Sequence, residues 1–243
     1  MQRKCMAAVL AVSMLAMGAA RAADEEKADD KGATTPFQIS LWNPVQLYDA
    51  DTAVHGLRLN LIYGKNESVS GLDLGIANRV GGDFNGVALG LINCAGDDVT
   101  GWQIGVLSHA RGDLNGHQFG LLACTEGEVN GSQCGVVALS KGGVNGEQHG
   151  VVACTQGNVD GAQIGVFAHA KGDVDGVQLG VLNCAGEVEG LQLGVVNYTK
   201  EVEGLQLGVL NITHELSGLQ IGVLNVQTER EFWKVLPIVN ASF

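Results

Sequence analysis

The sequence predicts an all-β protein built as a short-period β-solenoid, a stack of β-strand coils with capped ends. A glycine recurs every 15 residues from Gly56 to Gly176, and then every 14 residues up to Gly218. Around these twelve glycines the same cassette returns, reading approximately V-x-G-x-Q-x-G-V-V-N. The three prolines lie outside the array, as expected if every strand there uses its backbone N–H in a ladder. So short a period indicates stacked coils or hairpins rather than a closed globular active site.

Residues 1–22 have the three-part layout of a cleaved secretory signal. Two basic residues come first, an apolar run covers residues 6–17, and small residues end at Ala22. The run is shorter than the roughly 20 residues that a membrane-spanning helix needs. Cys5 precedes the run, whereas a lipid-attachment cysteine would follow it. The mature chain is therefore predicted to begin at Ala23 and to carry no lipid anchor.

The mature chain is strongly acidic. The formal net charge of the whole chain is −12, and removal of the signal takes away three basic residues and no acid, which leaves −15. Nucleic acid and anionic lipid are therefore disfavoured as partners. Residues 23–35 are charged and small, which is typical of a disordered acidic spacer.

Positions within a repeat are counted from its glycine, which is position 0. Position +4 is Gly from Gly75 to Gly222, position +2 is Gln in nine consecutive repeats from Gln103 to Gln220, and position +5 is always Val, Leu or Ile. In a parallel stack, equivalent positions lie about 4.8 Å apart. The glutamines are therefore predicted to form a ladder of hydrogen-bonded amides. Replacing Gln220, near the end of the array, is predicted to cost less stability than replacing a glutamine in mid-array. The +5 aliphatics are predicted to fill a thin core, and the +4 glycines to allow a sharp bend.

A turn closes each repeat, between position +7 and the next valine. Its glycine, as in residues 95–98 and 110–113, is predicted to supply the positive φ that turns require. The change from 15 to 14 residues falls in this turn, so the strands are kept.

The flanks of the array differ from it in composition. Residues 36–55 and 229–243 are richer in large aromatic and aliphatic side chains than the array at 56–228. Because the open end of a solenoid invites edge-to-edge aggregation, we expect both flanks to act as caps.

An antiparallel outer-membrane β-barrel of about 12 strands is the alternative architecture. The terminal aromatic Phe243 and a two-repeat alternation at position +8 favour it. Against it, aromatic residues make up only 5% of the chain, polar Glu147 and His149 occupy strand centres, and antiparallel pairing gives nine identical glutamines no common role.

The alternation at position +8 is the strongest candidate for chemistry. Cysteine and histidine types suit zinc, but their spacing matches no established zinc motif. Small half-buried fillers of a corner are the favoured interpretation, because a thiol packs as a small hydrophobe. Disulfides within the column are not expected, since its cysteines stand two coils apart, beyond bridging distance. The column contains Cys94, His109, Cys124, Cys154, His169 and Cys184.

Acidic residues gather beside the repeat glycine and in the turns. They could form weak calcium sites or a solvated edge that keeps the protein soluble, and the second interpretation is favoured. Because no nucleophile–base arrangement stands apart from the repeats, an enzyme is not expected, and we assign no catalytic, cofactor-binding or metal residue. The acids are Asp97, Asp98, Asp113, Glu126, Glu128, Asp160, Asp173, Asp175, Glu189 and Glu203.

A resemblance to other repeat proteins rests on three cassettes, at residues 190–197, 204–211 and 218–225. With their GLQLGVVN-type units, the chain resembles a group of bacterial secreted or surface repeat proteins. The resemblance implies placement in the periplasm, at the outer surface or outside the cell, and no established activity. The leading hypothesis is thus a non-enzymatic exported protein that presents a stiff acidic surface to an envelope or extracellular partner. A metal-binding solenoid is a further alternative, as is the barrel.

Overall fold

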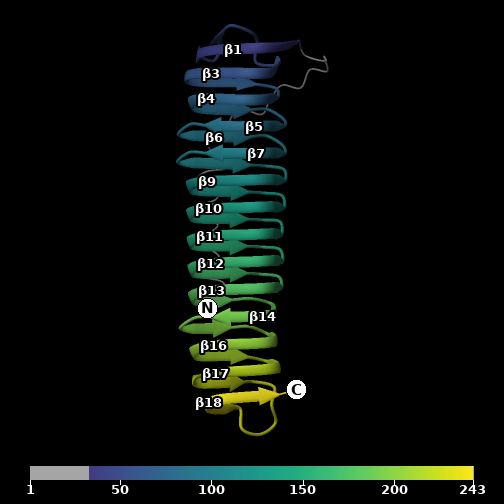
Figure 1. The fold of residues 1–243 in the computed structure, drawn as a ribbon, viewed down its shortest axis with the longest axis vertical. Coiled ribbons are helices and arrows are strands. Elements are labelled where there is room, and N and C mark those ends of the chain that lie inside the picture. Colours follow the sequence, from purple (N-terminus) through teal and green to yellow (C-terminus); the bar gives the residue numbers. More distant parts are fainter. Residues whose placement is uncertain (1–32, 243) are drawn as a thin grey trace. The chain divides into compact units, whose positions relative to one another are not determined.

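The computed structural model describes residues 33–242, which form one stack of β-coils (Figure 1). The expected signal at residues 1–22 lies outside the described residues, as does the expected spacer up to residue 32. The described residues contain no helix long and apolar enough to cross a membrane. The strands are β1 (Thr34–Trp42), β2 (Val45–Gln46), β3 (Ala53–Asn66), β4 (Val69–Val80), β5 (Phe84–Leu89), β6 (Ile92–Ala95), β7 (Val99–Ile104), β8 (Leu107–Ala110), β9 (Leu114–Thr125), β10 (Val129–Ser140), β11 (Val144–Thr155), β12 (Val159–Ala170), β13 (Val174–Cys184), β14 (Glu187–Leu193), β15 (Val196–Tyr198), β16 (Glu201–Thr213), β17 (Glu215–Gln227) and β18 (Val235–Ser242).

The coils pair in parallel, each on the equivalent positions of the next. Between β10 and β11, for example, Gly131 lies opposite Gly146 and Gln133 opposite Gln148. Parallel pairing continues from β3 through β17. The β-solenoid is therefore confirmed and the antiparallel barrel is wrong.

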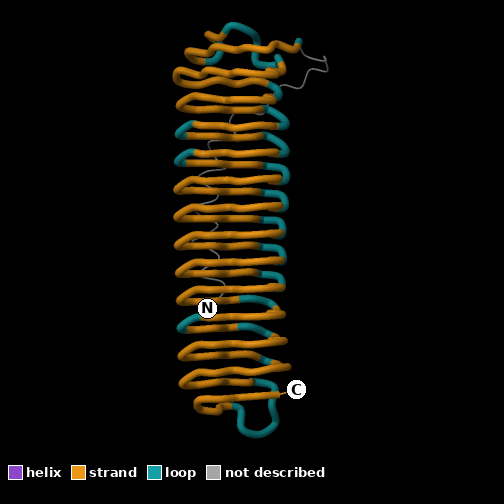
Figure 2. The backbone as a smooth tube through the Cα atoms, in the orientation of Figure 1, coloured by secondary structure: helices purple, strands orange, loops and turns teal. Residues whose placement is uncertain are grey.

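Each coil has two edges of different backbone structure. At one edge the chain bends at positions +4 and +5, and nine strands, such as β10, run through this bend without interruption. At the other edge a loop closes the coil in nearly every repeat (Figure 2). The 14-residue coils lose their residue in this loop, and their strands stay in register.

The repeat glycine holds the unusual backbone conformation, not the glycine of the turn. All twelve repeat glycines have φ between 118° and 147°, whereas no turn glycine among the described residues is in this range. A Cβ on Gly146 would lie 2.2 Å from the carbonyl oxygen of Gly131 in the coil before it. Only glycine meets both demands, which explains why the period is marked by this residue. The positive φ predicted for the turns is therefore wrong.

The glutamines at position +2 form the predicted ladder in the interior. Gln163 Nε2 donates to Gln148 Oε1 at 2.8 Å, and Gln163 Oε1 accepts from Gln178 Nε2 at 2.8 Å. The same bond links each glutamine from Gln118 to Gln220 to the one before it. These side chains are buried, so every amide exchanges water for a neighbouring amide.

Other interior columns are polar as well. Asparagines at position +7 donate to each other in the C-terminal coils, as Asn197 Nδ2 does to Asn211 Oδ1 at 2.8 Å. Asn197 also donates to the Leu207 carbonyl oxygen at 2.7 Å, at the bend of the next coil. In the middle coils this column changes to alanine, as at Ala138 and Ala153, which are fully buried.

The apolar core is the column at position −2, and not the +5 residues as predicted. Val129, Val159 and their equivalents are essentially inaccessible to solvent. The +5 residues point away from the interior at the bend, and Val136 is 47% exposed. The prediction for the +5 column is therefore wrong.

Strands outside the repeat array lie on the first and last coils. At the start, β2 pairs antiparallel with β1, and Gln38 Nε2 donates to the Tyr48 carbonyl oxygen at 2.9 Å. At the end, β18 pairs antiparallel with β17. Asn240 of β18 continues the glutamine ladder, because its Nδ2 donates to Gln220 Oε1 at 2.9 Å.

Candidate functional site

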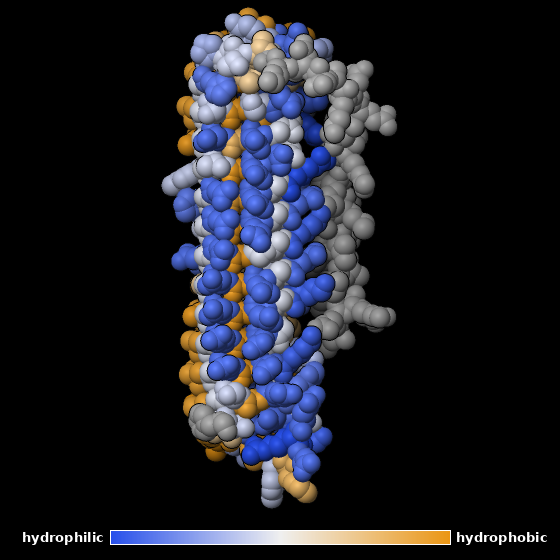
Figure 3. Space-filling model, turned by 90° about the vertical axis from the view of Figure 1, so that its right-hand side faces the viewer, coloured by the Kyte–Doolittle hydropathy of each residue, from blue (hydrophilic) through white to orange (hydrophobic). Residues whose placement is uncertain are grey.

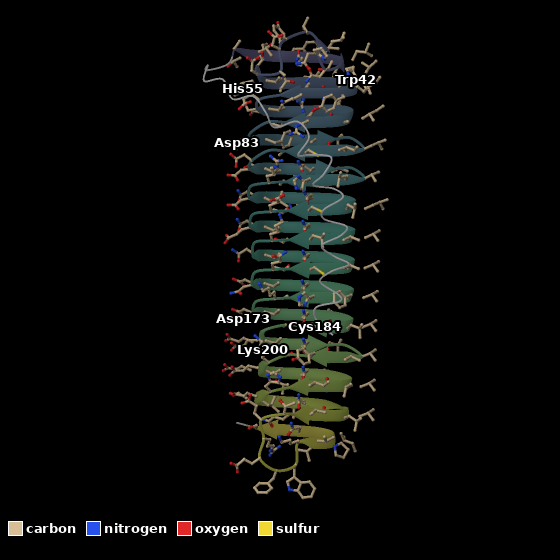
Figure 4. All side chains as sticks on the ribbon, turned by 180° about the vertical axis from the view of Figure 1, so that it is seen from behind. Trp42, His55, Asp83, Asp173, Cys184 and Lys200 are labelled. Carbon is tan, nitrogen blue, oxygen red and sulfur yellow. The ribbon has the colours of Figure 1, made fainter. Side chains whose placement is uncertain are left out.

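Acidic side chains are stacked along the loop edge of the coils, at the position three before each repeat glycine. Eight of the ten residues at this position, from the coil of Gly86 to that of Gly218, are Asp or Glu. Figure 4 shows Asp83 and Asp173 projecting from this edge, far apart along the stack. The acidic column consists of Asp83, Asp98, Asp113, Glu128, Asp173, Glu187, Glu201 and Glu215.

Backbone hydrogen bonds hold several members of the acidic column in place. The Asp98 carboxylate accepts from the Asp113 backbone N–H at 2.7 Å, and the Asp113 carboxylate accepts from the Glu128 N–H at 2.8 Å. Asn158, which interrupts the column, uses its Oδ1 in the same way toward the Asp173 N–H at 3.1 Å. Because one carboxylate oxygen is bonded, these side chains keep one orientation along the edge.

The column concentrates negative charge. The pKa of Glu187 is raised above its ordinary value, first by desolvation and then by the charges of Glu201 and Asp173 in neighbouring coils and of Glu203 and Glu189. Figure 3 faces the loop edge and shows hydrophilic residues in columns parallel to the axis of the stack. An extended field of one sign attracts cationic groups and repels anionic ones.

A column of basic residues at position +10 lies next to the acidic column. It was missed in the sequence, although Arg111, Lys141, Lys171 and Lys200 recur at every second coil. Lys141 Nζ pairs with Glu126 at 2.9 Å, and His109 Nε2 lies 3.4 Å from the same carboxylate. Partial burial raises the pKa of Glu126, but Lys141 and His109 outweigh this effect and lower it. The edge therefore has an acidic side and a mixed side.

A shallow recess of about 250 Å³ lies where Gly143 interrupts the acidic column. Glu128 and Asp160 contribute carboxylates to its lining, and Asn145 and Asn158 contribute amides. A donor-rich cationic side chain matches this set of acceptors.

The Cys and His residues at position +8 are in register, as predicted. Cys94 lies opposite His109 and His109 opposite Cys124, and the same holds for Cys154, His169 and Cys184. Burial lowers the pKa of His109 and His169. It raises the pKa of the Cys94 thiol and raises that of Cys124 to about 11. Zinc binds the thiolate, so a metal at this column would have to displace protons from thiols whose anionic form is disfavoured by burial.

Three ligand atoms of this column do not converge on one point. Within residues 33–242, the group of three or more His, Cys, Asp or Glu side chains whose ligand atoms all lie within 4.8 Å of one another is Asp83, Asp97 and Asp98, all exposed. Zinc sites need three or four ligands around one ion. The structure thus brings together neighbouring pairs of the +8 column and not a complete zinc site.

Comparison of the chain with protein-family models, with curated proteins and with solved structures found no match.

Proposed function

We propose that the protein is a non-enzymatic exported repeat protein that presents a stiff acidic surface to a cationic partner at the cell envelope. The acidic column supports this proposal most directly. Its eight carboxylates form two runs of four on one line, on either side of Gly143 and Asn158, with a spacing of about 4.8 Å within each run. A linear array suits an extended partner with repeated positive charges. The coil stack supports it because a solenoid offers long surfaces rather than clefts.

The rigidity of the surface follows from the interior. Each coil is tied to the next by backbone ladder bonds and by the Gln amides, as at Gln148 and Gln163. The hydrogen bond from the Asp113 N–H to Asp98 extends this order to the carboxylates. A partner that binds a preordered surface loses less conformational entropy of the protein on binding.

Binding of a lysine decapeptide tests the acidic surface. The variant Asp98→Asn/Asp113→Asn keeps the side-chain acceptors, as Asn158 shows in its own coil, and removes two adjacent charges. We expect it to bind the peptide at least tenfold more weakly than wild type at low salt, and we expect 0.5 M salt to weaken wild-type binding strongly. The measurement is calorimetry or fluorescence anisotropy.

The variant Glu229→Gln/Glu231→Gln is the matched control. It removes two charges from the segment between β17 and β18, outside the acidic column. We expect a loss of less than threefold. Equal losses in the two variants would show that the net charge, and not the column, attracts the peptide.

Export is tested separately from binding. Intact mass and N-terminal sequencing of the protein recovered outside the cytoplasm should give Ala23 as the first residue. Protein that keeps residues 1–22 and remains in the cytoplasm would contradict the envelope placement.

A further inference from the structure

An uninterrupted line of exposed aliphatic side chains runs along the bend edge of the stack. The residue at position +5 is Val, Leu or Ile in every coil, and each of these side chains is between 44% and 64% exposed. Figure 4 shows the side chains on this edge projecting away from the ribbon, on the side of the stack opposite Asp83 and Asp173. The aliphatic edge is defined as the eleven residues at this position from the coil of Gly71 onward, which are Ile76, Leu91, Val106, Leu121, Val136, Val151, Val166, Val181, Val195, Val209 and Val223.

Neighbouring columns widen this edge. Residues at +3 and +6 flank it, and several are also exposed, such as Leu193 and Leu182. Position +4 is glycine, so no side chain stands between the +3 and +5 columns. Together the three columns expose apolar surface on the order of 1,000 Å² or more, which exceeds the largest patch of a typical monomer.

Charge and area favour a second copy of this chain as the occupant. The acidic column lies on the opposite edge, so two copies that meet at their aliphatic edges keep their acidic columns far apart. Contact over most of the edge would bury on the order of 800 Å² per copy, as much as a stable specific interface needs. Any other self-contact would bring acidic surfaces closer together.

The spacing of the edge is also self-complementary. Because both copies repeat at about 4.8 Å, the side chains of one edge fit between those of the other along the whole length. Each copy has one such edge, so the contact closes after two copies. We propose that two copies of this protein pair through their aliphatic edges to form a dimer with the two acidic columns facing outward.

The mass of the protein in solution, measured by sedimentation equilibrium between about 1 and 100 µM, tests the dimer. Wild type should be dimeric in this range. Val151→Glu/Val166→Glu places a charge on two adjacent coils at the middle of the edge, where both residues are about half exposed. It should be monomeric, with its dissociation constant raised at least 100-fold. Circular dichroism and a thermal melt check that it folds.

The variant Asn145→Asp/Asn158→Asp adds two negative charges at exposed positions of the loop edge, where the next coil already has Asp160 and Asp173. It should remain dimeric. Dissociation in this control would assign the effect to net charge and overturn the proposal. A monomeric wild type would overturn it too. Flotation with phosphatidylcholine vesicles distinguishes a lipid occupant: vesicle binding by a monomeric wild type, lost in Val151→Glu/Val166→Glu, would replace the second copy by a membrane surface.

Discussion

The interior column at position +2 contains two stretches that satisfy the hydrogen bonds of their buried polar side chains in different ways. From Gln103 onward, every coil places a neutral amide there, and each amide bonds to the next. In the first two coils the position holds Arg58 and Asp73, which are both buried and joined by two hydrogen bonds, at 2.8 and 2.5 Å. Arg58 also donates to the Arg79 carbonyl oxygen at 2.8 Å. Each amide both donates and accepts, so the amide stretch can continue from coil to coil. The charged stretch is limited to two coils, because Arg58 and Asp73 satisfy each other.

The comparison teaches that this column requires satisfied hydrogen bonds rather than one residue type. Ala88 separates the two stretches and bonds to neither. The larger Phe84 replaces valine at position −2 of the same coil, and both side chains are buried. Both belong to one cluster of buried apolar residues, and we infer that the Phe84 ring occupies volume that a glutamine side chain fills in the later coils.

The largest effect should come from breaking the charged pair. Asp73→Ala leaves the Arg58 guanidinium buried without its partner and should lower the free energy of unfolding by about 4 kcal/mol. Chemical denaturation measures this change. Arg58→Gln/Asp73→Gln, which converts the pair to amides, should recover most of the loss. A double variant as unstable as Asp73→Ala would show that the two stretches are not interchangeable.

A smaller loss should follow from interrupting the amide stretch. Gln163→Leu removes the bonds to Gln148 and Gln178 and leaves the Gln178 amide short of an acceptor, at a cost of about 2 kcal/mol. Gln103→Leu, at the end beside Ala88, removes one ladder bond and should cost about 1 kcal/mol. Denaturant melts of both variants show whether the loss of stability depends on the number of ladder bonds removed. Equal losses of free energy of unfolding would contradict the ladder.

Placing a glutamine between the charged stretch and the amide stretch should change the stability little. Phe84→Val/Ala88→Gln restores the residues of the other coils and gives the new amide a neighbour on each side, Asp73 and Gln103. We expect a stability within about 1 kcal/mol of wild type. Ala88→Gln alone keeps Phe84 and should be destabilised by about 2 kcal/mol through overpacking. A single variant as stable as the double variant would refute the exchange of volume.

The smallest effect concerns the pH dependence of stability. Amides do not titrate, so in the amide stretch this dependence should come from acids on the surface of the coils, such as Glu187. The pKa of Glu187 is raised in the folded state, so the folded protein binds this proton more tightly than the unfolded chain. Its contribution therefore favours folding more as pH falls from 7 toward 4, with the sign opposite to ordinary acid denaturation. Glu187→Gln should raise the melting temperature slightly at pH 7 and not at pH 4. A gain that is equal at both pH values would contradict the charge mechanism.

The period, the parallel coils and the Gln ladder could be predicted from the sequence, because each depends on the same residue recurring at the same place. Which side of each strand faces inward could not. Alternation separates Gln133 from Val136 but does not place either one inside, and the usual preference for buried valine gave the wrong answer for Val136. The polar side chain is inside because equivalent amides satisfy each other along the stack.

For the candidate surfaces, too, the sequence predicted some features and not others. The register at Cys94 and His109 followed from the period. The acidic column was predicted only in part: four of the ten predicted acids belong to it, and four of its members were not predicted. The four that were predicted are Asp98, Asp113, Glu128 and Asp173. The absence of convergence in the +8 column follows from geometry, since neighbours along one column lie on a line rather than around a point. The expectation that Gln220 is a weak end of the ladder also fails, because Asn240 arrives from β18, outside the repeat.

Arg230 gives the Gln ladder a direction. Its Nη1 donates to Asn240 Oδ1 at 2.8 Å, and a guanidinium can only donate. Asn240 must therefore turn its Nδ2 toward Gln220, and each amide in turn sets the orientation of the next as far as Gln103, about 40 Å away at the spacing of parallel strands. One amide cannot invert alone without facing donor to donor on one side and acceptor to acceptor on the other. Backbone carbonyls in the middle coils favour the same direction, because Gln163 Nε2 also donates to the His169 carbonyl oxygen at 3.2 Å. Arg230 and these carbonyls together thus orient a line of aligned dipoles through most of the protein, and reversal would have to be concerted.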